Sequence, residues 1–599
     1  MKKLLLILNT MFLGVILSVP AMADKIVTVD TIRIGKIVYK LNVPSNAEIL
    51  LTNRSTSPQQ IDTVCSVTFG IADKRIIGKQ PVSLAPAEDK KIKVSWDSGK
   101  NDGGYEFRVE LYLNGKLIDS RSEYAAVTNV ITSAGQYSVA NPGWFSKPGQ
   151  EKVYIDELRR NYFSFAEYYT WTSCPMTGLT PPEDEWMPHT ESQVSYEAVV
   201  NKKFVKSFVA EAHQNGIAVF PWMNGEVALP TGLDHPEYFR YGKNGQPLLY
   251  NGTVHNGKRY AIAYTSYLYN EENAYKWGRE MAKSIDMFGW DGCRFDWAFL
   301  PATIGDPMRA TKSDWFNFAG KSARELYPDQ DTEGTKFLQA FRKGVAETHP
   351  EFIYGTNAGD EIAQKVAALE KYHKEASTNS WLWFEYLLNY EKYTWEEWIT
   401  KITQDASLSR LNNCQVGIGW MSPPPASATV TAKLLPYLFV YSGIHWIGPM
   451  DRDLPRGENW KIWRYAMRYS AYFYNNEFKL LSEDKRFNTI SVAGGKRLFW
   501  KQWVFEKQTA TGRELMINMV NLPEGKNILA DHKIPAPQQN VVLTFNKNSN
   551  EKFKQAVVLN AEPEPNSAVL ESSVENNTVT VKIQSVTWGA SVLIETANQ

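Results

Sequence analysis

The segment Gly289–Ala298 places an arginine and an aspartate two residues apart in a strand-like pattern. Asp291 and the glycine after it predict a turn that begins the strand, in which Arg294 and Asp296 share one face. In a parallel β/α barrel the carboxyl ends of the strands carry the chemistry. An arginine one pleat earlier favours the ionised form of a carboxyl, as a nucleophile requires. The alternative is a structural arginine–aspartate pair inside a barrel.

A second carboxylate, Glu385, stands in an aromatic setting. Trp381, Trp383, a phenylalanine and a tyrosine surround it. Apolar surroundings raise the pKa of a carboxyl and keep it protonated, as a general acid requires. An ionised Asp296 and a protonated Glu385 would form the two-carboxylate pair of a glycosidase. The alternative for Glu385 is an inward-facing barrel residue bonded to the backbone.

Both carboxylates fall in a stretch, beginning near Gln136, in which strand and helix patterns alternate. Such alternation is typical of an α/β fold. Helical periodicity precedes three of the strands, over Phe204–His213, Ala274–Phe288 and Asp331–Thr348. Eight candidate strands predict a (β/α)8 TIM barrel; they are Tyr162–Tyr169, Ile217–Trp222, Tyr260–Tyr264, Gly292–Trp297, Phe352–Asn357, Trp381–Tyr386, Gln415–Trp420 and Tyr437–Trp446.

Further polar and aromatic residues near these strand ends are candidates for substrate contacts. Sugar rings present flat C–H faces that stack on aromatic rings, so the candidates for stacking are Trp222, Trp297, Trp383 and Trp420. The candidates for contacts with hydroxyl groups are polar, and each could equally serve loop structure. They are Glu226, Asn357, Asp360 and Asp453, and Arg294 is a further candidate for substrate binding.

Strand-rich segments flank the barrel. From Ile26 to about Thr132 the chain predicts an immunoglobulin-like β-sandwich, with a hairpin turn at Asn114-Gly115. Its expected role is packing, with sugar binding as the alternative. From about Asn476, strands expected from Phe487 onward predict an antiparallel β-sandwich. The predicted multidomain α/β organisation is a signal peptide (1–23), the immunoglobulin-like sandwich (24–135), the catalytic barrel (136–475) and the C-terminal sandwich (476–599).

The N-terminus has the pattern of a bacterial export signal. Two lysines precede an apolar run, and Ala21-Met22-Ala23 fits a cleavage site before Asp24. We therefore expect a secreted or periplasmic protein with no membrane insertion in its mature form. The four cysteines are scattered and lack metal-ligand spacing, so we expect mostly buried free thiols and no metal site; they are Cys65, Cys174, Cys293 and Cys414.

The composition of the 599-residue chain narrows the class of ligand. Lys+Arg and Asp+Glu both number 65, so no net field favours nucleic acid or an anionic membrane. Aromatic residues make up 13%, including 20 Trp and 30 Tyr. This richness indicates a carbohydrate partner, although large barrels also use many aromatic residues in packing.

The order of segments and the motifs resemble glycoside hydrolase family 66, the dextranases and cycloisomaltooligosaccharide glucanotransferases. Gly-Trp-Asp-Gly-Cys-Arg-Phe-Asp is similar to the family's strand-four Gly-Phe-Asp-Gly-x-x-x-Asp, whose last residue is the nucleophile, and this implies that role for Asp296. The aromatic-flanked acid of strand six implies Glu385 as the acid/base. Asn357-Ala358-Gly359 is similar to the family's strand-five end, and Leu515–Asn521 to a strand of its C-terminal domain.

The resemblance implies a secreted retaining glycoside hydrolase that needs no cofactor and cleaves α-glucan, with endo action on α-1,6-linked, dextran-like chains. The chain departs from the family at Trp297-Ala298-Phe299, where Gln-Leu-Gly is usual, and at Leu387-Leu388, where Trp is usual. The family's carbohydrate-binding insertion has no obvious room, which favours hydrolysis over cyclisation. The alternatives are an α-galactosidase-like or amylase-like α-glycosidase and a non-catalytic glycan-binding barrel.

Overall fold

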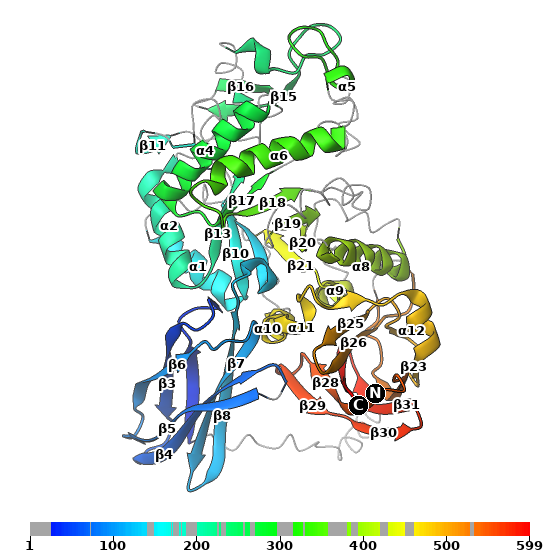
Figure 1. Cartoon of the computed structure of the whole chain (residues 1–599). Helices are drawn as coiled ribbons and strands as arrows, with labels where there is room; N and C mark the ends of the chain where they lie inside the picture. Colours follow the sequence, from blue (N-terminus) through cyan, green and yellow to red (C-terminus); the bar gives the residue numbers. More distant parts are fainter. Residues whose placement is uncertain are drawn as a thin grey trace, which may run out of the picture.

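The protein is a mixed α/β molecule built around a closed barrel of eight parallel strands, with antiparallel sheets beside it (Figure 1). The computed structural model describes residues 26–71, 73–140, 149–168, 171, 179–180, 182–186, 200–223, 227–228, 235–255, 258–263, 270–295, 315–326, 330–357, 380–384, 393–411, 413–419, 429–449, 460–526 and 532–599. Structural statements below concern these described residues.

The barrel strands follow one another around the barrel in chain order. They are β9 (Gln136–Ala140), β10 (Phe163–Tyr168), β13 (Ala218–Met223), β17 (Gly292–Phe295), β18 (Ile353–Asn357), β19 (Ser380–Phe384), β20 (Cys414–Gly419) and β21 (His445–Pro449). The helices between them are α1 (Gln150–Arg160), α2 (Lys202–Gln214), α4 (Glu271–Phe288), α6 (Gln330–Ala346), α8 (Trp395–Leu411) and α9 (Thr429–Ser442). The parallel pairing between neighbouring strands brings their carboxyl ends to one rim.

Six of the eight predicted barrel strands are confirmed, and two are wrong. Tyr260–Tyr264 falls largely in β16 (Lys258–Ala263), which pairs with β14 (Val227–Ala228) and β15 (Leu249–His255) in a separate antiparallel sheet. Tyr437–Trp446 is mostly the end of α9, and its strand begins only at His445. A short apolar run does not distinguish a buried helix from a buried strand, which explains the second error.

The first barrel strand, β9, was not predicted. The prediction missed one strand before β10 and included one false strand after β13, so the two errors cancel in the numbering of the later strands. As a result β17 and β19 are the fourth and sixth strands of the barrel, as the sequence indicated.

The predicted helices are confirmed, and α4 shows how local sequence sets the start of β17. The Asn270 side chain accepts hydrogen bonds from the backbone N–H groups of Glu272 (2.9 Å) and Asn273 (3.1 Å), which caps the helix N-terminus. At the other end Gly289 adopts a left-handed φ of 83°, a conformation that favours glycine. The chain therefore leaves α4 and enters β17 within three residues.

Two sheets precede the barrel and enclose a common apolar core that includes Ile49, Trp96 and Val109. One sheet has the order β1 (Val27–Arg33), β3 (Pro44–Asn53), β6 (Asp89–Asp97). The other has the order β2 (Val38–Tyr39), β8 (Lys116–Val127), β7 (Gly103–Leu113), β4 (Gln59–Phe69), β5 (Asp73–Leu84). The hairpin turn between β7 and β8 is confirmed, because Asn114 and Gly115 have φ values of 51° and 77°.

Two further sheets follow the barrel. The larger contains β22 (Lys479–Leu480), β25 (Val504–Thr509), β26 (Gly512–Asn521), β32 (Gly589–Asn598), β28 (Glu551–Asn560) and β29 (Asn566–Val569), with β24 (Leu498–Phe499) on β26. The smaller contains β23 (Ile490–Ala493), β27 (Gln538–Asn546), β31 (Thr578–Val586) and β30 (Glu571–Glu575). A helix, α12 (Glu483–Thr489), stands where a strand was predicted from Phe487, and the strand begins at Ile490. Short elements elsewhere are β11 (Glu185–Trp186), β12 (Val200–Asn201) and α5 (Ala323–Leu326).

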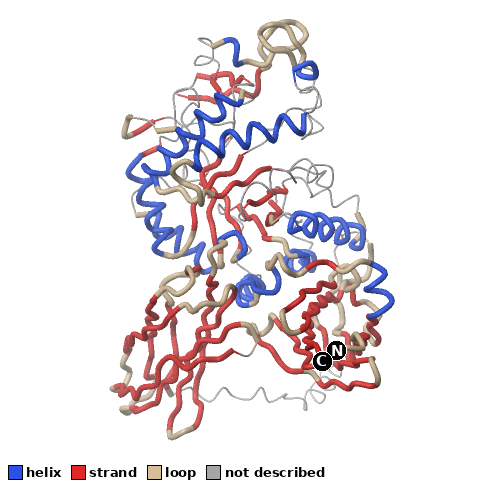
Figure 2. Tube along the Cα trace, viewed as in Figure 1, coloured by secondary structure: helices blue, strands red, loops and turns tan. Residues whose placement is uncertain are grey.

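The helix α10 (Trp460–Arg468), followed by α11 (Ser470–Phe473), joins the barrel to the sheets on both sides (Figure 2). A Cβ atom at Gly104 of β7 would lie 2.2 Å from the carbonyl oxygens of Met467 and Arg468, so only glycine fits this contact. Arg464 of the same helix forms an ion pair of 2.7 Å with Glu564, which follows β28. The helix thus contacts strands from both ends of the chain.

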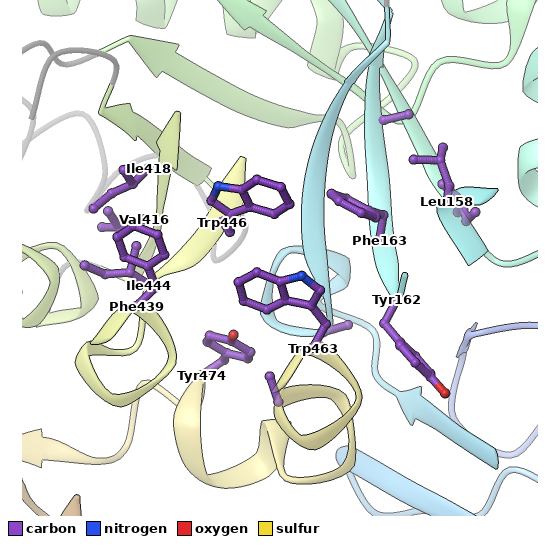
Figure 3. Close-up of a cluster of buried hydrophobic side chains, with 14 of the residues drawn as sticks. Leu158, Tyr162, Phe163, Val416, Ile418, Phe439, Ile444, Trp446, Trp463 and Tyr474 are labelled. Atoms are coloured by element: carbon purple, nitrogen blue, oxygen red, sulfur yellow. The ribbon is translucent and has the colours of Figure 1, made fainter. Parts of the chain in front are cut away.

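The outer face of the last barrel strand packs on α10. Trp446 of β21 stacks on Trp463 of α10, with ring centroids 5.3 Å apart and planes 7° apart (Figure 3). Offset stacking of this kind adds to the stabilisation from apolar burial. This contact fixes β21 against α10, the helix that also contacts the surrounding sheets.

The amino-terminal end of the barrel is closed by a buried histidine. His445 stacks between Tyr137 (centroids 4.4 Å apart) and Tyr474 (3.8 Å). Its Nδ1 donates to the carbonyl oxygen of Gly135 at 2.7 Å, and its Nε2 lies 3.3 Å from Oε1 of Gln415. Burial lowers the pKa of His445 to about 3, so the imidazole is neutral in the native protein.

This histidine should make the stability of the protein depend on pH. Between about pH 6.5, where an unfolded histidine titrates, and about pH 3, the unfolded chain binds a proton that the native state excludes. The free energy of unfolding should therefore fall as the pH falls, by at most ~1.4 kcal/mol per pH unit from this group. Urea unfolding of the wild type and His445→Gln from pH 7 to pH 4 measures the effect. The difference in the free energy of unfolding between the wild type and His445→Gln should shrink as the pH falls. A difference that stays constant from pH 7 to pH 4 would contradict the prediction.

No helix within the described part of the chain is long and apolar enough to span a membrane. Cys65, Cys293 and Cys414 are buried and free, which confirms the expectation for these three cysteines; Cys174 lies outside the described residues.

Candidate active site

The two candidate catalytic carboxylates come directly after two strands of the same barrel. Strand β17 ends at Phe295, the residue before Asp296, and β19 ends at Phe384, the residue before Glu385. Only β18 separates these strands in the barrel. Asp296 and Glu385 themselves lie outside the described residues.

The packing of the side chains of β17 shows which of them face into the barrel and which face outward. Cys293 and Phe295 belong to the core outside the barrel, where the Phe295 ring meets Phe341 of α6 with centroids 4.8 Å apart. Arg294 points the other way, into the barrel, where it binds Glu167 of β10. The predicted pleat of this strand is therefore confirmed for the residues before Asp296.

The barrel interior is filled by a layer of large side chains that includes Tyr137, Phe165, Phe220, Ile353 and Trp381. The Trp381 ring lies over Gly355, where an added Cβ atom would be 2.3 Å from the ring. Gly355 therefore leaves the space that this tryptophan fills. The interior of this barrel is therefore packed, and in barrels of this kind active sites lie at the carboxyl-end rim.

Above this layer, Arg294 and Glu167 form a buried bidentate ion pair. Arg294 Nε donates to Glu167 Oε2 at 2.8 Å, and Nη2 donates to Oε1 at 2.7 Å. Each side chain is only 1% exposed. Glu167 is thus a described partner of Arg294, and the expected effect of Arg294 on Asp296 stays a prediction, because Asp296 lies outside the described residues.

The tryptophan on β13, the strand between β10 and β17, is fully enclosed. Trp222 of β13 is 0% exposed, and its carbonyl oxygen accepts a hydrogen bond of 2.9 Å from Trp171 Nε1. Stacking of its ring on a sugar would need the covering side chains to move. Arg294, also predicted to contact substrate, uses two of its donors on Glu167.

The other predicted contact residues lie at the limits of the described structure. Asn357 is the last residue of β18 and pairs with Trp383 of β19, but the side chains of both lie outside the described part. The remaining predicted contact residues lie outside the described residues altogether; they are Glu226, Trp297, Asp360, Trp420 and Asp453. Within the described ranges, no group of three or more His, Cys, Asp or Glu side chains could hold a metal ion.

Sequence reasoning missed the role of Glu167. Its signal was an isolated carboxylate at an inward position of a strand whose residues are all buried, between Ala166 and Tyr168. A fully buried glutamate needs a partner of opposite charge or several hydrogen bonds. The sequence therefore held a reason to look for a cation facing β10, although it could not name Arg294.

The strand order, the closed barrel and the flanking sheets define a β/α-barrel protein with added β-sheets. No family model matches the chain, and no curated protein matches it. A cycloisomaltooligosaccharide glucanotransferase of Paenibacillus sp., solved with cycloisomaltoheptaose, has the same fold, with a TM-score of 0.72 and 10% identity over 95% of this chain and 100% of that chain.

Two amylases share less of the architecture. A maltogenic α-amylase of Thermotoga neapolitana gives a TM-score of 0.45 at 12% identity, and an α-amylase of Lactobacillus plantarum gives 0.42 at 9% identity. Each match covers 78% of this chain and 100% of the other. The match to the glucanotransferase shows a common fold over nearly the whole chain.

Proposed function

We propose that this protein is a retaining glycoside hydrolase that acts on α-glucan, with Asp296 as nucleophile and Glu385 as acid/base. The observation that carries the proposal is that β17 and β19, separated by one strand of a closed parallel barrel, end directly before these two residues. Carboxylates at such strand ends belong to the rim where barrel enzymes carry out catalysis.

The spacing of the strands supports retention rather than inversion. Neighbouring strands lie about 4.8 Å apart, so two strands with one between them are separated by about 9–10 Å. Side chains that both point into the barrel approach one another from this distance. The distance between the two carboxyl groups is then shorter than the distance between the strands. This favours the 5–5.5 Å typical of retaining enzymes over the roughly 6.5–9.5 Å of inverting ones.

The reaction that follows is a double displacement. Asp296 attacks the anomeric carbon while Glu385 donates a proton to the leaving oxygen, which gives an ester between the sugar and Asp296. Glu385 then takes a proton from water, and the water oxygen displaces Asp296 at the same carbon. Two inversions yield the original anomeric configuration.

For the substrate, we propose endo-cleavage of α-1,6-linked, dextran-like glucan. The resemblance of the Gly289–Asp296 motif to the dextranase family supports this choice. The fold shared with a glucanotransferase that was solved with a cyclic isomaltooligosaccharide supports it too. The alternatives are an α-glycosidase of another linkage and a glycan-binding barrel without activity.

A polysaccharide screen with anomer-resolved products tests the proposed function. Dextran, pullulan, starch and α-galactosides are incubated with the protein, and NMR records the first anomer released. Release of α-configured isomaltooligosaccharides from dextran, with an early fall in viscosity, is the expected result. Products from starch or galactoside alone would replace the proposed substrate, and β-configured products would rule out retention. Binding to a glucan without cleavage would overturn the enzyme assignment.

We further propose that the protein is exported and that the chain divides at about residues 135 and 475 into an immunoglobulin-like unit, the barrel and a C-terminal sandwich. The export pattern at Lys2-Lys3 and Ala21-Met22-Ala23 motivates the first part. The mature protein should begin at or near Asp24 and be found outside the inner membrane. N-terminal sequencing of protein from the native host checks this, and retention of Met1 would contradict it.

A further inference from the structure

One aromatic side chain stands out because it is exposed at the tip of a hydrogen-bonded turn. Phe318 is 63% exposed and lies in the turn of residues 316–322. The Asn317 N–H donates to the Lys321 carbonyl oxygen at 2.9 Å, and the Asn317 side chain accepts a 2.9 Å hydrogen bond from the Lys321 N–H. Gly320 has a left-handed φ of 78°, which favours glycine at this point. The turn therefore holds Phe318 in place by its own hydrogen bonds, without burying the ring.

A second turn, of residues 241–247, pairs with the first. Tyr241 and Phe316 exchange two backbone hydrogen bonds of 2.8 Å, which join the two turns. The Tyr241 ring lies against Phe318, with centroids 6.0 Å apart and planes 51° apart. The Tyr241 hydroxyl donates to the Pro236 carbonyl oxygen at 2.8 Å, which fixes this supporting ring. Because the rings are already ordered, binding a ligand on Phe318 costs little conformational entropy.

The residues at the bases of the two turns are buried. Trp315 is 0% exposed and Arg240 is 4% exposed. The guanidinium carbon of Arg240 lies 5.4 Å from the centroid of the Trp315 ring, which is a cation–π contact. The Leu248 N–H donates to the Arg240 carbonyl oxygen at 2.7 Å, and the Ala323 N–H donates to that of Trp315 at 2.8 Å. Both turns are thus anchored at their bases, while Phe318 at the tip faces solvent.

Both turns belong to loops that leave the carboxyl ends of barrel strands. Residues 241–247 lie between β13 and α4, and residues 316–322 lie between β17 and α6. In a parallel β/α barrel the active site is built from such loops. The neighbouring elements β15, β16 and α5 lie at the end of the molecule opposite to the flanking sheets (Figure 1). Phe318 is therefore exposed on the side of the barrel from which a substrate approaches the rim.

A single exposed ring among polar groups suits a sugar better than a protein. A stable protein interface needs about 1,000 Å² of complementary surface with an apolar centre. The described residues beside Phe318 in its turn are polar or small; they are Asn317, Ala319, Gly320 and Lys321. A glucose ring presents flat C–H faces to an aromatic ring and hydroxyl groups to polar side chains. Exposed polar side chains on the two turns include Lys243, Asn244 and Lys321.

We propose that Phe318, supported by Tyr241, is an accessory binding site for an α-glucan chain: it holds a part of the polymer that extends beyond the catalytic centre. The identity of this ligand rests on the proposed function. A chain bound at two places is held more tightly than a chain bound at one, because the second contact forms within the complex. The site would therefore favour long glucans over short oligosaccharides.

Replacing the exposed ring tests this site directly. Phe318→Ala should weaken the binding of dextran about tenfold, since it removes the surface on which the sugar packs. Phe318→Leu should lose nearly as much, because an aliphatic side chain has no flat face, and Phe318→Trp should bind at least as well as the parent. Native electrophoresis in gels with and without dextran measures the binding of the full-length protein. All proteins in this assay carry Asp296→Asn, so that the polymer stays intact.

Kinetics of the enzyme with its native Asp296 gives a second readout. The ratio of kcat/KM on dextran to kcat/KM on isomaltotriose should fall about tenfold in Phe318→Ala, since a trisaccharide leaves no chain for a second contact. Phe487→Ala is the matched control, because Phe487 of α12 is 49% exposed in the part of the chain that follows the barrel. It should change neither the retardation by dextran nor this ratio.

Each outcome decides the inference. If Phe318→Ala matches its parent in retardation and in the kinetic ratio, the inference is overturned, while the proposed function stands. Parental binding by Phe318→Leu also overturns it, because the contact then needs no ring. If Phe318→Ala does not fold, Phe318→Leu carries the test. A dimer in sedimentation that Phe318→Ala abolishes, without an effect on dextran, would assign the ring to a second copy of this chain and overturn the inference.

Failure of the proposed function gives a different result from failure of this site. A wild-type protein that cleaves no glucan overturns the proposed function. Retardation by dextran that depends on Phe318 would still support the binding site in that case, and its absence would overturn the site as well.

Discussion

Replacing Asp296 with asparagine should lower the turnover of every glucan that the wild type cleaves by several orders of magnitude. The amide has nearly the shape of the carboxylate but cannot form the glycosyl ester, so both steps of the double displacement lose their covalent intermediate. The loss should be equally severe for substrates with good leaving groups, because these still need a nucleophile. Steady-state kinetics on dextran and on an aryl or fluoride glycoside measures both.

Asp291 offers a matched control within the same motif. Its carboxylate lies at the start of β17, where Oδ2 is 2.8 Å from His213 Nε2 and accepts a 2.8 Å bond from the backbone N–H of Val219. Asp291→Asn should reduce the stability of the fold and leave the turnover of the remaining folded protein close to that of the wild type. A result in which Asp291→Asn abolishes turnover and Asp296→Asn spares it would reverse the assignment of the nucleophile.

Replacing Glu385 should give damage that depends on the leaving group. Proton donation typically contributes about 10²- to 10⁴-fold, so Glu385→Gln should lose this factor on dextran. A nitrophenolate or fluoride hardly needs a proton, so the first step on such substrates should be partly spared. The second step still lacks its base, and the ester on Asp296 should accumulate to a level that mass spectrometry detects.

Azide provides the complementary test with Glu385→Ala. A small anion attacks the intermediate without deprotonation, so it should restore turnover and produce the α-glycosyl azide. Equal loss on natural and activated substrates, with no azide rescue and no adduct, would show that Glu385 is not the acid/base. The search would then move to the other carboxylates that follow barrel strands within a few residues of the sequence, which are Asp360, Glu226 and Asp453.

Local signals predicted those parts of the barrel whose structure is fixed locally. The sequence indicated β17 because a helix C-cap glycine, a turn and an alternating segment follow one another within a few residues. Strand β9 gave no such signal, because Gln136–Ala140 is short and partly polar. It becomes a strand through pairing with β10 and with β21, and β21 is more than 300 residues away in the chain. Closure of a barrel is a non-local event that periodicity does not reveal.

The partner of Arg294 shows the same limit within the site. The carboxylate nearest to Arg294 in the sequence is Asp296, which lies outside the described residues, and a described partner, Glu167, lies 127 positions away. Strand alternation correctly gave the direction of Arg294, but only the order of the strands brings β10 within reach. The sequence predicted which residue types follow the strands. It could not predict which buried charged side chains, such as Glu167 and Arg294, form ion pairs inside the barrel.

The contacts of α10 bear on any attempt to transplant the barrel into another protein. Cutting the chain near residue 135 would remove Gly104 from the carbonyl oxygens of Met467 and Arg468, and Glu123 from the Tyr162 hydroxyl that it binds at 2.6 Å. Cutting it near residue 475 would remove the Leu559 carbonyl and the Ser591 hydroxyl that bond to Tyr465. The barrel is therefore not expected to fold without the sheets on both sides. An exchange of substrate specificity between proteins of this fold would need grafting of the loops at the carboxyl ends of the strands onto an intact chain.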